Sequence, residues 1–125
     1  LLRRVGTFPV NRRDADFAAV RKAYQLLKEG KVVGLFPEGT RSKTGALQKA
    51  YNGAALIAVR SGTPILPLAI VGPYRFLQPI KVYIGPLFEL PPLNCEHKAD
   101  KKLKLEQMSA LIMENIGKLF PANEN

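Results

Sequence analysis

The segment KVVGLFPEGTRS, residues 31–42, joins an apolar run to a polar motif rich in turn residues, and the fold prediction starts from it. The apolar run at residues 31–36 predicts a short buried strand. Pro37 and Gly39 then predict a turn. Such a turn lies at the carboxyl end of the strand, where open α/β sheets bind ligands. The segment therefore predicts a strand that ends at a candidate ligand site.

Helical patterns flank this segment on both sides. Upstream, residues 14–31 carry apolar side chains at helical spacing and reach a stop at Gly30. Downstream, residues 47–62 are rich in alanine and leucine and predict a second helix. Apolar residues spaced from Leu105 to Leu119 predict a third helix near the end of the chain.

Strand patterns separate these helices. VGTFPV, residues 5–10, predicts a short strand that Pro9 places at an edge. Residues 63–71 and residues 80–85 predict two more. Alternating strands and helices predict the α/β class, with a mixed β-sheet covered by helices. The length of 125 residues suits one domain, residues 1–125.

Charge and composition favour an anionic partner. The chain has 19 Lys and Arg against 10 Asp and Glu, a formal charge of +9. Lipid headgroups, phosphorylated metabolites and nucleic acid are all compatible with this excess. No apolar run approaches the roughly 18 residues of a membrane span. Cys95 is the single cysteine, which excludes an intramolecular disulfide.

The polar motif has two interpretations from its residues alone. Gly39 permits close approach to the backbone, Thr40 offers a hydroxyl, and Arg41 can form paired hydrogen bonds with a phosphate. Alternatively, Glu38 and Arg41 form an exposed ion pair worth only about 0–1 kcal/mol. The order of residues does not match a nucleotide-binding P-loop, which disfavours a nucleotide hydrolase.

Other candidate residues are weaker. His97 is the only histidine and lies in a loop pattern without a partnered nucleophile, which favours an incidental surface residue. Cys95 reads as a small, partly buried side chain. One histidine and one cysteine with distant carboxylates match no usual metal-ligand spacing, so no metal is expected.

Three blocks, taken in order, resemble glycerophospholipid acyltransferases of the 1-acyl-glycerol-3-phosphate acyltransferase (lysophosphatidate acyltransferase) type. FPEGTRS, residues 36–42, resembles the third signature block of that family. GTFPVNR, residues 6–12, resembles the second, and TPILPL, residues 63–68, resembles the fourth. Three blocks in the family's order are more specific than any one of them.

One family block is missing from these 125 residues. The first block, H-x-x-x-x-D, supplies the catalytic histidine and lies upstream of the second. His97 stands downstream and has the wrong spacing to Asp100. We therefore expect that no catalytic residue lies in this chain and that the general-base histidine lies upstream of Leu1. The chain would then be the C-terminal portion of a single acyltransferase domain that is incomplete at its N-terminus. Alone, this portion is expected to be inactive.

The resemblance also implies a set of substrate-binding residues. They are Arg12, Glu38, Gly39, Thr40 and Arg41. Arg12 and Arg41, with Arg13 as a helper, would hold the acceptor's phosphate. Glu38 would orient Arg41 or the glycerol hydroxyl, and Gly39 with Thr40 would shape the turn.

Substrates and partners follow from the same resemblance. The implied reaction moves an acyl group from acyl-CoA or acyl carrier protein to 1-acyl-glycerol-3-phosphate, giving phosphatidic acid in phospholipid synthesis, with no cofactor and no metal. A membrane surface is an expected partner, with a location on the cytoplasmic face of the membrane, and no specific nucleic acid is expected. The alternative is a noncatalytic lipid- or anion-binding module with a degenerate acyltransferase fold.

Overall fold

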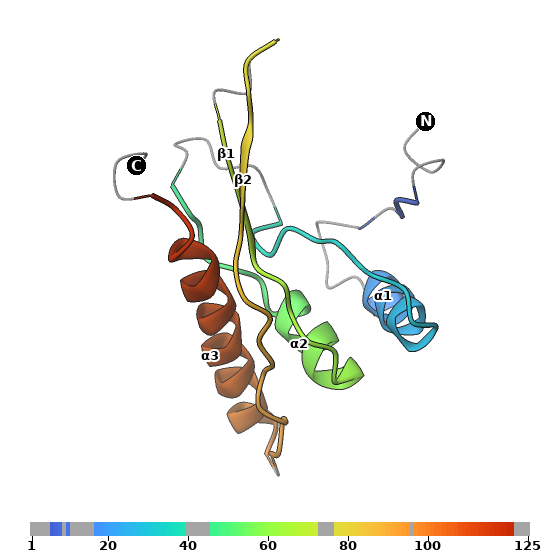
Figure 1. Ribbon diagram of the computed structural model, residues 1–125. Helices are drawn as coiled ribbons and strands as arrows, with labels where there is room; N and C mark the ends of the chain where they lie inside the picture. The colour runs from blue at the N-terminus through green and yellow to red at the C-terminus, as the bar shows by residue number, and fades with distance from the viewer. Residues whose placement is uncertain are drawn as a thin grey trace. The chain divides into compact units, whose positions relative to one another are not determined.

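The computed structural model describes residues 6–8, 10, 17–39, 46–72, 77–95 and 97–121. Its elements, in chain order, are α1 (Phe17–Lys28), α2 (Asn52–Ser61), β1 (Leu68–Val71), β2 (Lys81–Ile84) and α3 (Lys98–Gly117), all shown in Figure 1. The chain divides between Leu35 and Phe36 into two compact units. Helix α1 belongs to the first unit, and the other elements belong to the second.

Helix α1 confirms the first predicted helix, and its end follows from glycine chemistry. Gly30 has a φ of 75° and donates its N–H to the carbonyl of Leu27 at 3.0 Å. Lys31 donates to the carbonyl of Leu26 at 3.0 Å. This pair of bonds is the Schellman arrangement, in which a left-handed residue satisfies the last carbonyls of a helix. Gly30 therefore stops α1 as the sequence predicts.

The predicted strand at residues 31–36 is wrong for this structure. These residues form neither a strand nor an isolated bridge, and Val32 is 96% exposed. A strand requires a neighbouring backbone to satisfy its N–H and C=O groups, and within the described ranges no strand pairs with this segment. Residues 6–8 and 10, from the strand predicted at residues 5–10, are likewise not in a strand.

The hairpin of the second unit confirms the two later strands. β1 pairs with β2 in antiparallel register, with Leu68 opposite Ile84 and Val71 opposite Lys81. Beyond the strands, Ile65 and Phe88 exchange two backbone hydrogen bonds of 2.8 and 3.0 Å. Helices together with this sheet confirm the α/β class. Among the residues described, the sheet has these two strands.

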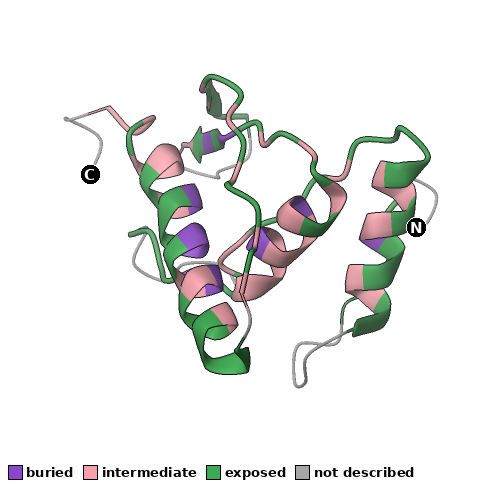
Figure 2. Ribbon diagram, turned by 90° about the horizontal axis from the view of Figure 1, so that it is seen from below, coloured by how far each residue is buried: buried purple, intermediate pink, exposed green. Residues whose placement is uncertain are grey.

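Helices α2 and α3 pack against each other and enclose the core. Ala55 of α2 is fully buried, and Leu105, Met108 and Ile112 of α3 are nearly so. Figure 2 shows the buried residues on the facing sides of these two helices. The small side chain of Ala55 lets the longer side chains of α3 pack closely against α2. Burial of each large apolar side chain contributes about 1.5–3 kcal/mol.

A polar contact crosses the same helix pair. Ser109 is 3% exposed, and its Oγ donates to the carbonyl of Leu105 at 2.8 Å and lies 3.1 Å from the side-chain oxygen of Asn52. A hydroxyl carries one proton, so it serves these two oxygens alternately. The contact fixes the register of α3 against the first turn of α2.

Helix α2 begins five residues later than predicted. The pattern at residues 47–62 suggests a helix from Leu47, whereas the structure starts it at Asn52. Tyr51 has extended backbone angles, with a φ of −81° and a ψ of 151°. Gly62 ends the helix with a φ of 62° and donates its N–H to the carbonyl of Ala58. In the N-terminal part of the predicted helix, the backbone N–H groups of Gln48 and Tyr51 bond to residues 37–38 instead.

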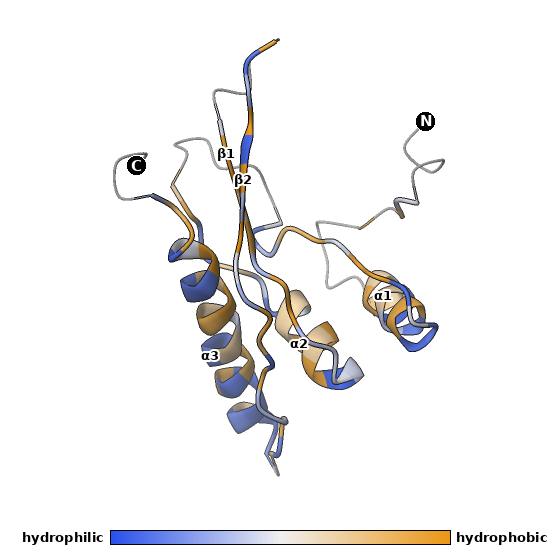
Figure 3. Ribbon diagram, in the orientation of Figure 1, coloured by the Kyte–Doolittle hydropathy of each residue, from blue (hydrophilic) through white to orange (hydrophobic). Residues whose placement is uncertain are grey.

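The two faces of the hairpin differ in exposure. Ala69 is 2% exposed, and β1 contacts α3. Two cross-strand pairs on the opposite face, Leu68 with Ile84 and Ile70 with Val82, are all exposed. Figure 3 shows hydrophobic residues on both strands. The alternation has the period of two that strands impose on side chains.

Gly85 marks a close approach at the end of the hairpin. A Cβ atom at this position would lie 2.9 Å from Leu119 and 2.9 Å from the ring of Pro67. Gly85 also donates its N–H to the carbonyl of Pro67 at 3.0 Å. Only glycine leaves room for both neighbours.

In the part of the chain that the structure describes, no helix combines the length and apolarity needed to cross a membrane.

Candidate functional site

The first half of the FPEGTRS motif forms a hydrogen-bonded turn. Gly39 donates its N–H to the carbonyl of Phe36 at 3.0 Å. Pro37 takes the second position of this four-residue turn, which suits the fixed φ of proline, and glycine is favoured at the fourth. Gly39 has a φ of 67°, a conformation that side chains with a Cβ rarely adopt. The sequence prediction of a turn is confirmed.

Tyr51 covers one side of this turn. It donates its N–H to the carbonyl of Pro37 at 3.0 Å. A Cβ atom built on Gly39 would lie only 3.0 Å from the Cδ2 and Cε2 atoms of the Tyr51 ring. Glycine is therefore required at position 39 for two reasons, its backbone angle and the nearby ring.

The carboxylate of Glu38 accepts a hydrogen bond from an unexpected donor. Its Oε2 lies 2.9 Å from the backbone N–H of Gln48, ten residues along the chain. The sequence suggested Arg41 or a substrate hydroxyl as the partner of Glu38. The bond therefore joins the residue Glu38, which precedes residues 40–45 in the chain, to Gln48, which follows them.

The structure brings two of the predicted site residues together, the neighbours Glu38 and Gly39. Arg12, Thr40 and Arg41 lie outside the described residues, as does the suggested helper Arg13. Sequence reasoning missed the contributions of Gln48 and Tyr51. Gln48 gives no side-chain signal because its backbone donates the bond. For Tyr51, an aromatic residue just before a glycine-containing helix was the one available hint.

The two residues given little weight in the sequence lie just before the start of α3. His97 is exposed and immediately precedes α3, where its carbonyl accepts from the N–H of Lys101 at 3.2 Å. Cys95 is half-buried and has a free thiol. Within the described ranges, no three His, Cys, Asp or Glu side chains gather closely enough to hold a metal ion.

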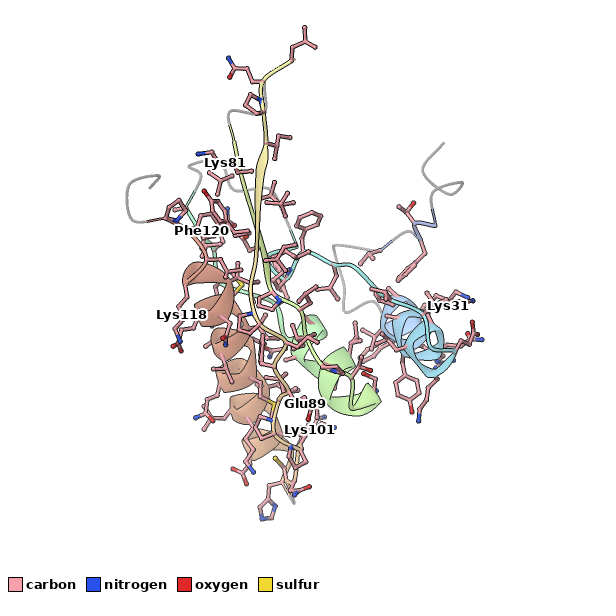
Figure 4. All side chains as sticks on the ribbon, in the orientation of Figure 1. Lys31, Lys81, Glu89, Lys101, Lys118 and Phe120 are labelled. Atoms are coloured by element: carbon pink, nitrogen blue, oxygen red, sulfur yellow. The ribbon has the colours of Figure 1, made fainter. Side chains whose placement is uncertain are left out.

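In the first unit, one exposed ion pair shifts a titration. The ammonium of Lys31 lies 2.6 Å from Oε2 of Glu29, just after α1 (Figure 4). The hydrogen bond and positive charge of Lys31 lower the pKa of the Glu29 carboxyl. Both side chains are solvated, so this pair is a surface feature.

A family model described as Acyltransferase matches residues 1–71, more than half of the 125 residues. The chain belongs to this acyltransferase family. The matched region contains the whole turn at residues 36–39, the segment that contacts it at residues 48–51, and helix α2. The resemblance drawn from the sequence blocks is therefore confirmed.

Curated relatives agree with the family. A 1-acyl-sn-glycerol-3-phosphate acyltransferase of Bacillus subtilis is 38% identical over 72 residues, covering 58% of this chain and 35% of the relative. One from Borreliella burgdorferi is 28% identical over 125 aligned residues, covering 91% of this chain and 47% of the relative. A chloroplastic one from Brassica napus is 37% identical over 70 residues, covering 54% and 20%.

The chain matches less than half the length of each of these three relatives. The matches from Bacillus and Brassica cover little more than half of this chain, whereas the one from Borreliella extends over most of it. No solved structure matches the chain significantly.

Proposed function

We propose that this chain forms the acceptor-binding part of an enzyme that acylates 1-acyl-glycerol-3-phosphate. The acyl group comes from a thioester, on coenzyme A or acyl carrier protein, and the product is phosphatidic acid. The observation that carries the proposal is the tight turn at residues 36–39, which lies inside the family match and leads directly into Thr40 and Arg41. The names of the three relatives support the choice of acceptor.

The reaction needs a base, a held acceptor and a leaving thiolate. A histidine removes the proton from the free hydroxyl of the acceptor as the oxygen attacks the thioester carbonyl. The carbon–sulfur bond then breaks, and the thiolate receives a proton, so the products are an ester and a thiol. We place that histidine upstream of Leu1, in the family's H-x-x-x-x-D block. The role of this chain is to hold the acceptor at a fixed distance from it, because positioning supplies much of the rate.

We assign the acceptor's phosphate to Arg12 and Arg41, with Arg13 as a helper. A guanidinium forms two parallel hydrogen bonds with a phosphate, which fixes orientation as well as distance. Gly39 and Thr40 shape the backbone beside it. The Gln48 bond to Glu38 supports a role for Glu38 in setting the direction in which the chain leaves the turn.

The charge of +9 supports a membrane-facing role. The acceptor, coenzyme A and anionic lipid surfaces all attract cations, at about 1 kcal/mol per well-placed Lys or Arg. We therefore propose that the protein works at the cytoplasmic face of a membrane. We also propose, from the family resemblance, that it uses no metal or other cofactor.

The test uses the protein encoded by the complete reading frame. Arg41→Ala is expected to raise the KM for 1-acyl-glycerol-3-phosphate by about 10- to 100-fold, the size of a lost charge-assisted phosphate contact. The KM for the thioester should stay unchanged. Arg60→Ala, which removes an exposed arginine from the last turn of α2, serves as the matched charge control.

Two results would contradict the proposal. One is an acceptor KM that responds equally to Arg41→Ala and Arg60→Ala. The other is a complete protein that binds the lipid without turnover, which would favour the noncatalytic lipid- or anion-binding module.

A further inference from the structure

We propose that residues 48–51 act as a positioning clamp for the turn at residues 36–39, and so set where the acceptor's phosphate binds. This inference rests on the proposed function and adds residues that the signature motif does not contain. Three contacts between the two segments carry it. They are the Gln48 N–H to the Glu38 carboxylate, the Tyr51 N–H to the Pro37 carbonyl, and the Tyr51 ring against Gly39.

The clamp fixes the turn on both sides of Glu38. The carbonyl before Glu38 accepts from Tyr51, and the Glu38 side chain itself accepts from Gln48. Gly39 follows immediately and lies against the ring of Tyr51. The direction in which the chain leaves Gly39, the last described residue before Thr40 and Arg41, is therefore set by contacts with residues 48–51. Holding a binding group in place before substrate arrives reduces the entropy lost on binding.

The clamp is in turn anchored to the core. Tyr51 is the residue before α2, and Ala50 beside it is 8% exposed. Helix α2 packs on α3 through Ala55. The turn is thus connected to the best-packed part of the second unit by a stretch of about four residues. Sites built on such rigid supports hold their geometry better than isolated loops.

The charge on Glu38 also has a purpose in this arrangement. A carboxylate that accepts from an amide N–H forms a stronger bond than a neutral acceptor. Glu38 therefore acts here as a positioning residue, because it shapes the turn through Gln48.

The most specific variant removes one backbone hydrogen-bond donor. Gln48→Pro eliminates the N–H that bonds to Glu38, whereas Gln48→Ala keeps it and serves as the matched control. The readouts, made on the protein encoded by the complete reading frame, are the amide chemical shifts of Gly39 and the affinity for short-chain 1-acyl-glycerol-3-phosphate below its micelle concentration. A monoacylglycerol of the same chain length reports binding that does not depend on the phosphate.

The clamp predicts a shifted Gly39 amide and about tenfold weaker phosphate-dependent binding for Gln48→Pro, with little change for Gln48→Ala. Equal affinity of the two variants would overturn the clamp while leaving the proposed function intact. If the unaltered chain shows no phosphate-dependent binding, the proposed acceptor site fails and the clamp proposal fails with it.

A second pair of variants tests the ring in the protein encoded by the complete reading frame. Tyr51→Ala removes the ring from Gly39, and Tyr51→Phe keeps it. The expected result is a severalfold higher KM for the acceptor in Tyr51→Ala, an unchanged KM for the thioester, and rescue by Tyr51→Phe. A general loss of stability would instead lower kcat or the amount of folded protein without this split, and that outcome would contradict the positioning role. Thermal unfolding of each variant distinguishes the two.

Discussion

The helix pair α2 and α3 and the turn at residues 36–39 are stabilised in different ways. The helix pair excludes water from Ala55, Met108 and Ile112, so the hydrophobic effect holds it together. In the turn, Phe36 and Gly39 are exposed and the two residues between them are half-buried, and Tyr51, which covers one side of it, is 66% exposed. Its shape depends on directional bonds to backbone N–H groups and on one glycine.

Because of this difference, the core of the second unit determines its stability, whereas the turn determines the candidate binding function. Losing a core side chain affects the whole second unit, whereas losing a turn contact affects a local direction of the chain. Loops that carry function on a rigid scaffold commonly show this division. Substitutions in the two regions should therefore give different ratios of lost stability to lost binding.

The largest effect is expected in the core. Ile112→Ala should lower the free energy of unfolding by about 2–4 kcal/mol, because it leaves a cavity beside Ala55 as well as removing buried surface. Leu103→Ala, in the same helix but 57% exposed, should change it by less than about 1 kcal/mol. Urea unfolding followed by circular dichroism measures both. Equal losses would show that α3 does not pack as described.

The next largest effect on stability is expected for Gly39→Ala, which should reduce lipid binding more than it reduces stability. The positive φ and the Tyr51 ring together should make the turn less stable by about 1–2 kcal/mol. Phosphate-dependent lipid binding should fall by more than the loss of global stability alone explains. Gly34→Ala is the control, since among the described residues no atom lies within 4 Å of the place that a Cβ atom on Gly34 would take, and its φ is not positive. Unchanged binding in Gly39→Ala would separate the turn from the acceptor site.

Ser109→Ala probes the polar contact between the helices. Removing the buried hydroxyl should reduce stability by about 1 kcal/mol and leave lipid binding unchanged. A double-mutant cycle with Asn52→Ala isolates the contact between α2 and α3. A coupling energy of zero would mean that the bond to Leu105 alone accounts for the serine.

A smaller effect is expected on the outer surface of α3. Lys118 projects away from the hairpin and pairs with Glu114 at 2.6 Å (Figure 4). Lys118→Ala should reduce stability by at most about 0.5 kcal/mol, because both side chains are solvated. The effect should shrink further in 1 M salt. A loss as large as that of Ser109→Ala would show that the pair is less exposed than described.

The smallest effect concerns Glu29, which should titrate below its ordinary pKa because Lys31 donates to its carboxylate. Its small stabilising contribution is present above the pKa of the unfolded chain and is lost as the pH falls through the folded pKa. Lys31→Ala should raise the Glu29 pKa in an NMR titration. Lys22→Ala, which removes a weaker neighbouring charge, should raise it less.

The sequence predicted well where local patterns and tertiary structure agree. The stop at Gly30, the strands at residues 68–71 and 81–84, and the apolar positions of α3 were all recoverable. Glycine sterics and hydrophobic periodicity act locally, so a single sequence displays them. The FPEGTRS motif likewise predicted a turn and the family.

The errors occurred where distant backbone decides the outcome. Residues 31–36 have a strand pattern and no strand, because pairing depends on a neighbour rather than on the residues themselves. Residues 47–51 have good helix formers but remain outside α2, since the N–H groups of Gln48 and Tyr51 bond to the turn instead. Helix propensity is a weak preference that such contacts override.

By itself, the sequence determined the family, the turn and the composition of a basic chain suited to an anionic substrate. Only the tertiary structure decided what holds that turn. Gln48 and Tyr51 each donate a main-chain N–H to it, and every residue except proline carries that group, so these two bonds leave no signal in the pattern of side chains.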